Sequence, residues 1–158
     1  MPASLTITAG VTIRADPDAV WRLAVDWPRQ REWIWATRTC GGHGQGATVT
    51  ARTGIGPLRF TDTMLITEWD PPRRCTITHS GAVVRGEGVL EVLPRGGEGR
   101  CEFRWTERIL LPQPLVDLVP AVALPAVTWA AYAIIAPLAR AGLGSSLLRF
   151  ARLVGSGG

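Results

Sequence analysis

The order of the expected secondary-structure elements constrains the fold of this chain more than any other feature. Residues 5 to 13 alternate between apolar and polar side chains as a β-strand does, and a single capped helix follows them. From about residue 46 to 111 the pattern predicts six further strands separated by turns. The segment after them is rich in Leu, Val and Ala and is long enough to lie across every strand. We therefore expect a curved antiparallel sheet closed by one long helix, with a hollow between the two.

The start of the first helix is marked by residues that cap helices. Asp16 can accept hydrogen bonds from the free amides of the first turn, and Pro17 suits the first helical position because it has no N–H to leave unpaired. The helix is expected to run to about Val25 and to end at Asp26. Residues 31–35 are then expected to form a second short helix or a turn.

Length and cysteine content indicate one intracellular domain. With 158 residues the chain can bury one sufficient core, so we expect a single domain over residues 1–154 and a flexible tail at 155–158. The three cysteines have no C-x-x-C spacing, which argues against a disulfide framework and a zinc site. The first residues lack the basic segment and apolar run of a secretory signal. A cytoplasmic location follows as an expectation.

The charge pattern argues against a nucleic-acid partner. All 17 basic residues are arginine, which is typical of a GC-rich bacterial gene, and the net charge is only +4. The arginines are interleaved with glutamates along the strands, whereas nucleic-acid readers concentrate basic residues in one stripe. We expect a small-molecule partner instead, and the sequence leaves the oligomeric state open.

Three ionisable residues fall on the face of the sheet that should point inward. Alternation over residues 58–68 places Asp62 beside apolar positions, and the same test places His79 and Glu107 on the inner faces of their strands. Because a buried charge is costly unless it is paired, this pattern implies a wet cavity, mutual pairing or a bulge that shifts the register.

The three residues could have either of two roles. His79 with a carboxylate neighbour can act as a general acid and base, since histidine ordinarily titrates near neutrality, and a pH–rate profile should then bend near neutral pH. In the other interpretation the three groups lie at the cavity mouth and only fix the sheet. His43 and His79 lack the spacing of a metal site, and no nucleophile motif is present, so neither metal nor cofactor is expected.

Aromatic and other apolar side chains on the inner strand faces and nearby helices could form the walls of a binding cavity. Filling of the core is the alternative role for each of them. The candidate wall residues are Trp33, Trp35, Phe60, Met64, Ile77, Phe103, Trp105, Trp129 and Tyr132.

The C-terminal apolar segment has two interpretations. Residues 118–139 carry no formal charge and reach the length of a membrane span. Three prolines and many alanines weaken that signal, and Trp129 and Tyr132 lie near the middle of the segment rather than at its ends, where membrane aromatics concentrate. We favour a proline-kinked helix that covers the cavity over a membrane anchor.

The fragment Ala15-Asp16-Pro17-Asp18-Ala19-Val20-Trp21, the turn Asp70-Pro71-Pro72-Arg73 and the overall layout resemble the START-like superfamily, also called SRPBCC or Bet v 1-like. Within it, the chain is most similar to the polyketide cyclase/dehydrase and lipid-transport group. The resemblance implies an α+β helix-grip fold, with a seven-stranded antiparallel sheet wrapped around a long C-terminal helix and an apolar cavity between them.

What the resemblance implies about function is a choice between binding and catalysis. Members bind lipids, sterols, polyketides or hormones, and some catalyse cyclisation or dehydration in the cavity. The cyclase members use arginine and tyrosine in the pocket. Here Arg59 and Arg85 fall on the outer face by alternation. The leading expectation is therefore binding of a small hydrophobic molecule, oriented by Asp62, His79 and Glu107, and the second is a cyclase or dehydratase that uses those residues as acid and base.

Overall fold

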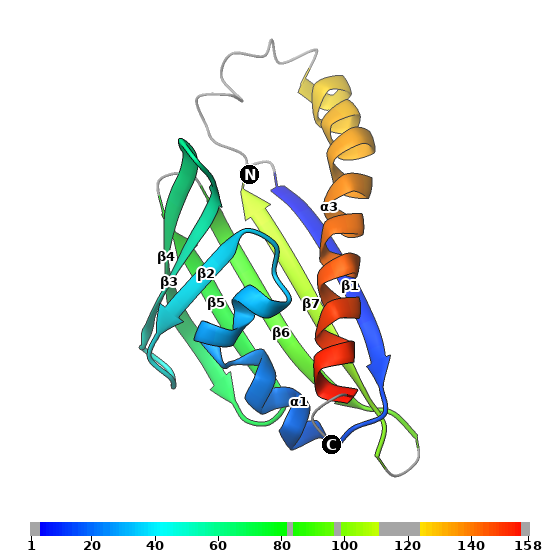
Figure 1. Ribbon diagram of the computed structural model, residues 1–158. Helices are drawn as coiled ribbons and strands as arrows, with labels where there is room; N and C mark the ends of the chain where they lie inside the picture. The colour runs from blue at the N-terminus through cyan, green and yellow to red at the C-terminus, as the bar shows by residue number, and fades with distance from the viewer. Residues whose placement is uncertain (1–3, 82–83, 97–98, 111–123, 156–158) are drawn as a thin grey trace.

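The computed structural model describes residues 4–81, 84–96, 99–110 and 124–155, apart from the side chains of 124–132, 134 and 135. Figure 1 shows the elements in chain order. They are β1 (Ser4–Ile13), α1 (Pro17–Ala24), the 3₁₀ helix η1 (Trp27–Glu32), β2 (Thr37–Gly41), β3 (Thr48–Ile55), β4 (Leu58–Asp70), β5 (Arg74–Ser80), β6 (Arg85–Pro94), β7 (Cys101–Leu110) and α3 (Leu124–Gly155).

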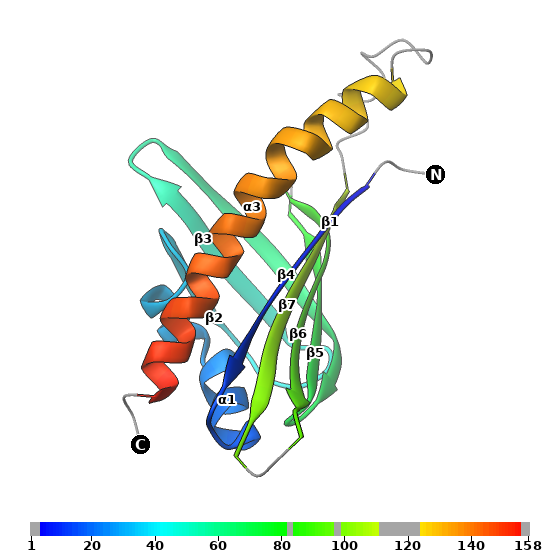
Figure 2. The ribbon, with the colours of Figure 1, turned by 90° about the vertical axis from the view of Figure 1, so that its right-hand side faces the viewer.

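The strands form one antiparallel sheet in the order β1-β7-β6-β5-β4-β3-β2. The long helix α3 lies along the sheet beside β1 and β7, and α1 and η1 cover the end at which α3 finishes (Figures 1 and 2). This arrangement is the helix-grip fold, so the predicted fold class is confirmed. The second strand begins earlier than predicted: β2 starts at Thr37, whereas the sequence pattern placed the strands after the first helix from about residue 46.

The two short helices begin at aspartate caps. The Asp16 carboxylate accepts a hydrogen bond from the Asp18 amide at 2.9 Å, and Pro17 occupies the first helical position. The second helix differs from the prediction of residues 31–35. Asp26 caps it by accepting from the Arg29 amide at 3.3 Å, so the aspartate expected only to end α1 also starts η1.

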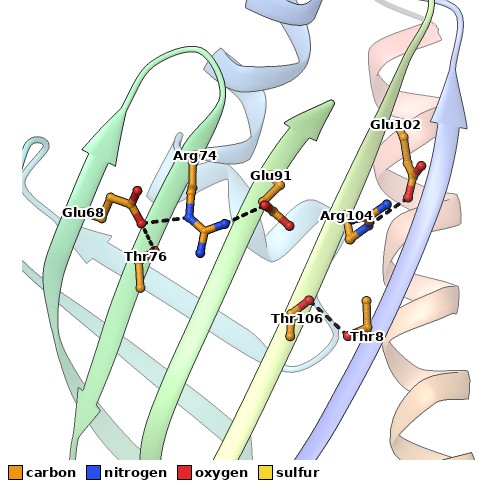
Figure 3. A network of polar contacts seen from close by, with 8 residues as sticks. All are labelled: Thr8, Glu68, Arg74, Thr76, Glu91, Glu102, Arg104 and Thr106. Atoms are coloured by element: carbon orange, nitrogen blue, oxygen red, sulfur yellow. Dashed lines mark hydrogen bonds and ion pairs between the residues drawn. The ribbon is translucent and has the colours of Figure 1, made fainter. Parts of the chain in front are cut away.

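The outer face of the sheet carries ion pairs between neighbouring strands (Figure 3). On β5, Arg74 donates to Glu68 of β4 at 2.8 Å and to Glu91 of β6 at 2.7 Å. On β7, Arg104 donates at 3.0 Å to Glu102 of the same strand. Because cross-strand pairs of opposite charge stabilise a sheet, the two contacts of Arg74 reinforce the solvent face and leave the inner face for apolar packing.

An aromatic cluster joins the sheet, the chain after η1 and the C-terminal helix. The ring of Trp33 lies edge-on to Phe103 and Trp105 of β7 and to Phe150 of α3, with centroids 5.1 to 6.0 Å apart. Phe103 and Phe150 stack with their centroids 4.3 Å apart. These contacts fix the C-terminal half of α3 against the concave face of the sheet.

Of the apolar segment 118–139, residues 124–139 belong to α3, which contains Pro137, and residues 118–123 lie outside the described residues. The sequence 147–153 continues the same helix rather than forming a partner helix. Within the described residues, no helix combines the length and the hydropathy needed to cross a bilayer.

Candidate functional site

A cavity of about 230 Å³ lies on the inner face of the sheet, beneath η1 and the segment that follows it. Apolar side chains make up most of its wall, and no arginine is among the described residues that line it. Its lining includes Trp33, Thr37, Thr39, Ala51, Phe60, Asp62, Met64, Ile77, His79, Gly88, Trp105 and Glu107.

Asp62, His79 and Glu107 meet in this cavity and form a carboxylate–imidazole–carboxylate triad. The Nδ1 atom of His79 lies 2.5 Å from Oδ2 of Asp62, and Nε2 lies 3.2 Å from Oε2 of Glu107. The second contact has ion-pair distance but lacks hydrogen-bond alignment. Glu107 also accepts a hydrogen bond from the indole N–H of Trp105 at 2.6 Å. Each of the three side chains is at least 86% buried, with exposed fractions of 6% to 14%.

Two glycines give the triad its room. Gly88 of β6 lies between β5 and β7, opposite both Ile77 and Glu107. A Cβ atom on Gly88 would stand 2.9 Å from Oε1 of Glu107 and 3.2 Å from Nε2 of His79, and one on Gly81 would stand 2.5 Å from Oδ1 of Asp62. The missing side chain on β6 therefore lets His79 reach Glu107 across a strand. A glycine inside a predicted strand is the signal in the sequence that could have indicated such a close approach.

The triad changes the expected titration of His79. Burial is the largest single influence and lowers its pKa, but the carboxylates of Glu107 and Asp62 together outweigh burial and raise the pKa to about 9. With this pKa, a rate that depends on His79 is expected to bend near pH 9 rather than near neutral pH. At pH 7 His79 is an imidazolium between two carboxylates, and the three groups together carry one net negative charge.

Four buried polar atoms of cavity-lining residues have no hydrogen-bond partner within the described structure. They are Nε2 of His79, which has only the ion-pair contact with Glu107, and Nε1 of Trp33, Oγ1 of Thr39 and Oδ1 of Asp62. Thr39 and Asp62 both pair with Ala51 of β3, so the hydroxyl and the carboxylate lie in line across three strands with only a small side chain between them. Since buried polar groups are nearly always satisfied, these atoms are available to a bound molecule.

The structure distributes the candidate wall residues unevenly. The five that line the cavity are Trp33, Phe60, Met64, Ile77 and Trp105. Phe103 is on the inner face of β7 as predicted, but Trp33 and Phe150 cover it, so it packs in the core.

The predicted wall position of Trp35 is wrong. Its side chain is 65% exposed, and it lies against an outer recess. Ala36, the residue directly after Trp35, has a left-handed φ of 50°. Trp129 and Tyr132 belong to α3, but their side chains lie outside the described residues.

The second histidine lies apart from the triad. His43 stacks on Trp27 with the ring centroids 5.9 Å apart, and its Nε2 lies 3.0 Å from the carbonyl oxygen of Val25. In the parts of the chain that are described, no three His, Cys, Asp or Glu side chains are grouped as metal ligands would be.

Comparison with known proteins agrees with the fold. Residues 4–153 match the family described as "Polyketide cyclase / dehydrase and lipid transport". The chain belongs to this family. The sequence matches no curated protein at a significant level. Because the family match spans most of the chain, the resemblance inferred from the sequence to the START-like, SRPBCC or Bet v 1-like superfamily is confirmed.

Solved structures similar to this member of the polyketide cyclase/dehydrase family include two enzymes. The Zhui aromatase/cyclase of Streptomyces sp. R1128 is 16% identical with a TM-score of 0.69, over 96% of this chain and 94% of that one. A norcoclaurine synthase mutant of Thalictrum flavum, bound to a transition-state analogue, is 13% identical with a TM-score of 0.55, over 87% and 95%. SA2116 of Staphylococcus aureus, a protein of unknown function, is 7% identical with a TM-score of 0.76, over 99% and 96%. At these identities the likeness shows the fold alone.

Proposed function

We propose that this protein binds a small hydrophobic molecule that carries a hydrogen-bond donor, such as a hydroxyl or a protonated amine. The observation that carries the proposal is the buried, unpartnered Oδ1 of Asp62, a residue that lines a mostly apolar cavity. Ligand pockets are commonly built from apolar walls with a few polar groups that fix orientation.

The charge of the triad defines the polar group that the ligand should carry. With His79 protonated, Asp62 and Glu107 leave one net negative charge in a cavity whose described lining contains no arginine. A donor or cation on the ligand can satisfy Oδ1 of Asp62, whereas a carboxylate on the ligand would meet like charge without a counter-ion. Fatty acids are therefore expected to be poor ligands, and alcohols or amines of similar size good ones.

Matched ligands test this selectivity. We expect octylamine to displace the fluorescent probe N-phenyl-1-naphthylamine at a concentration about tenfold lower than octanoate does, since one charge-assisted hydrogen bond contributes at least that factor. Fluorescence titration measures both displacement curves. The preference should disappear in Asp62→Asn and persist in Asp70→Asn, which changes an exposed aspartate of the same strand. Equal displacement by the two ligands in the unaltered protein would contradict the proposal.

Native mass spectrometry of protein purified without detergent, followed by analysis of an organic extract, identifies any molecule that co-purifies. A stoichiometric amine or alcohol would agree with the proposed ligand, which carries a hydrogen-bond donor. A stoichiometric carboxylic acid would contradict the proposal.

A second candidate function is dehydration or cyclisation of a polyketide-like chain, and the proximity of an acid to a base supports it. The imidazolium of His79 can give its Nε2 proton to a departing hydroxyl, which leaves as water. The carboxylate of Glu107 can take a proton from the adjacent carbon, whose C–H electrons form the new double bond. Transfer of that proton from Glu107 to His79 across 3.2 Å restores both groups. The aromatase/cyclase and synthase among the similar structures support this reading by analogy only.

The catalytic candidate predicts a distinctive pH dependence. Because His79 acts as the acid and its pKa is about 9, turnover of a β-hydroxy thioester of polyketide type should fall as pH rises through 9. Rates measured from pH 6 to 10 should show that decline, and His79→Gln should lower the plateau at least 100-fold. Turnover that His79→Gln leaves intact would exclude His79 as the acid.

A further inference from the structure

A second surface feature lies outside the cavity, around the start of β2 and the β3–β4 hairpin. It is a shallow recess whose basic side chains are Arg31, Arg38, Arg52 and Arg59, which we call the arginine recess. All four are exposed, and within the described structure none of them forms an ion pair. Glu32 also lines the recess, but its carboxylate is held by Arg29 at 2.9 Å.

The register of the strands places two of these charges against each other. Arg38 of β2 and Arg52 of β3 are directly opposite across the ladder. Like charges in that position destabilise a sheet, and a bound anion removes the repulsion. Elsewhere on the outer face of the sheet an arginine is paired with opposite charges, because Arg74 lies between the carboxylates of Glu68 and Glu91 (Figure 3).

Large apolar side chains stand beside the arginine recess. Trp35 is 65% exposed, and Ile55 and Leu58, which flank the two-residue turn of the β3–β4 hairpin, are 62% and 83% exposed. In both ribbon views this hairpin projects at the end of the molecule where α3 begins (Figures 1 and 2). A projecting apolar tip next to unpaired arginines combines the two features that hold proteins at anionic membrane surfaces.

We propose that the arginine recess and the hairpin tip dock this protein on the surface of an anionic phospholipid bilayer. The guanidinium groups bind lipid phosphates, for which they have matching geometry, while Ile55, Leu58 and Trp35 enter the boundary between headgroups and acyl chains. A bilayer fits better than a soluble anion because three exposed apolar side chains would otherwise remain in water. Thr37 lines both the recess and the cavity, so a docked molecule holds its cavity next to the lipid.

Co-sedimentation with vesicles tests the proposal on the full chain, and its outcome does not depend on what the cavity binds. We expect binding to vesicles of phosphatidylcholine with 30% phosphatidylglycerol, in ~0.1 M salt, and at least tenfold weaker binding to phosphatidylcholine alone. Arg38→Ala/Arg52→Ala should weaken binding about thirtyfold, at about fivefold for each arginine. Leu58→Ser should weaken it about tenfold.

Matched variants separate docking from general attraction to a basic protein. Arg85→Ala/Arg108→Ala removes two exposed arginines from another part of the surface, and Leu65→Ser changes a leucine on the outer face of the same strand that is 43% exposed. Both should bind as the unaltered protein does. Equal losses of vesicle binding in Arg38→Ala/Arg52→Ala and Arg85→Ala/Arg108→Ala would overturn the proposal, because net charge alone would then explain the binding.

Two further results would also overturn it. If Arg38→Ala/Arg52→Ala weakens binding but Leu58→Ser does not, the recess is a site for an acidic macromolecule or solute rather than a bilayer. If soluble glycerol 3-phosphate at millimolar concentration displaces the protein from vesicles, the recess recognises free phosphate. Circular dichroism of each variant shows whether a loss of binding follows from a loss of fold.

Discussion

Replacing Trp33 with alanine should lower the free energy of unfolding by about 4 kcal/mol, the cost typical of removing a large aromatic side chain from a packed core. The side chain is completely buried, and its ring contacts β7 and α3 through Phe103, Trp105 and Phe150. It is thus the residue through which the chain after η1 fixes the helix to the sheet. Urea denaturation followed by far-UV circular dichroism measures the loss.

The control for Trp33 lies two residues away. Trp35→Ala removes the same type of side chain at a position that is mostly exposed. The free energy of unfolding of this variant should stay within about 0.5 kcal/mol of that of the unaltered protein. The free energy of unfolding of Trp33→Phe should lie between those of Trp33→Ala and Trp35→Ala. A phenyl ring retains part of the edge-on packing, and the change removes an indole N–H that has no partner. Equal effects of Trp33→Ala and Trp35→Ala would contradict the packing described above.

Raising the pH should destabilise the protein through His79 by about 3 kcal/mol. The pKa of His79 is about 9 in the folded chain and near 6.5 in the unfolded chain, and each unit of difference corresponds to 1.36 kcal/mol. Because the folded pKa is the higher one, this stabilisation is complete below pH 6.5, decreases between the two values and is lost above pH 9. Urea denaturation at pH 6 and pH 10 measures the change.

Comparison with His79→Gln isolates the contribution of this histidine. Burial raises the pKa of Cys101 and raises that of Cys75 to about 12, so both thiols also disfavour the folded state at high pH. These effects are common to both proteins, and the unaltered protein should therefore lose about 3 kcal/mol more than His79→Gln. His43→Gln should keep the full pH dependence, because it leaves both carboxylates on His79. An NMR titration that places the His79 pKa at or below 6.5 would refute the ion-paired triad.

The sequence determined the fold and the facing of the strands. Alternation of apolar and polar residues identifies the inner face because side chains along a strand point to opposite sides, and this test placed Asp62, His79 and Glu107 inward. The aspartate and proline at 16 and 17 located the first helix because capping depends on residues adjacent in the chain. Such properties are local, so they can be predicted without knowing which strands are neighbours.

Only the tertiary structure decided which of these residues touch. Asp62, His79 and Glu107 meet because β4, β5, β6 and β7 are neighbours in the sheet and because Gly88 leaves the space between His79 and Glu107 open. Trp35 is exposed although Trp33, two residues earlier, is buried, and the ring of Trp33 covers Phe103. Contacts and titration behaviour depend on atoms that are distant in the chain, so alternation could place three charges on one face but could not show that they form one triad.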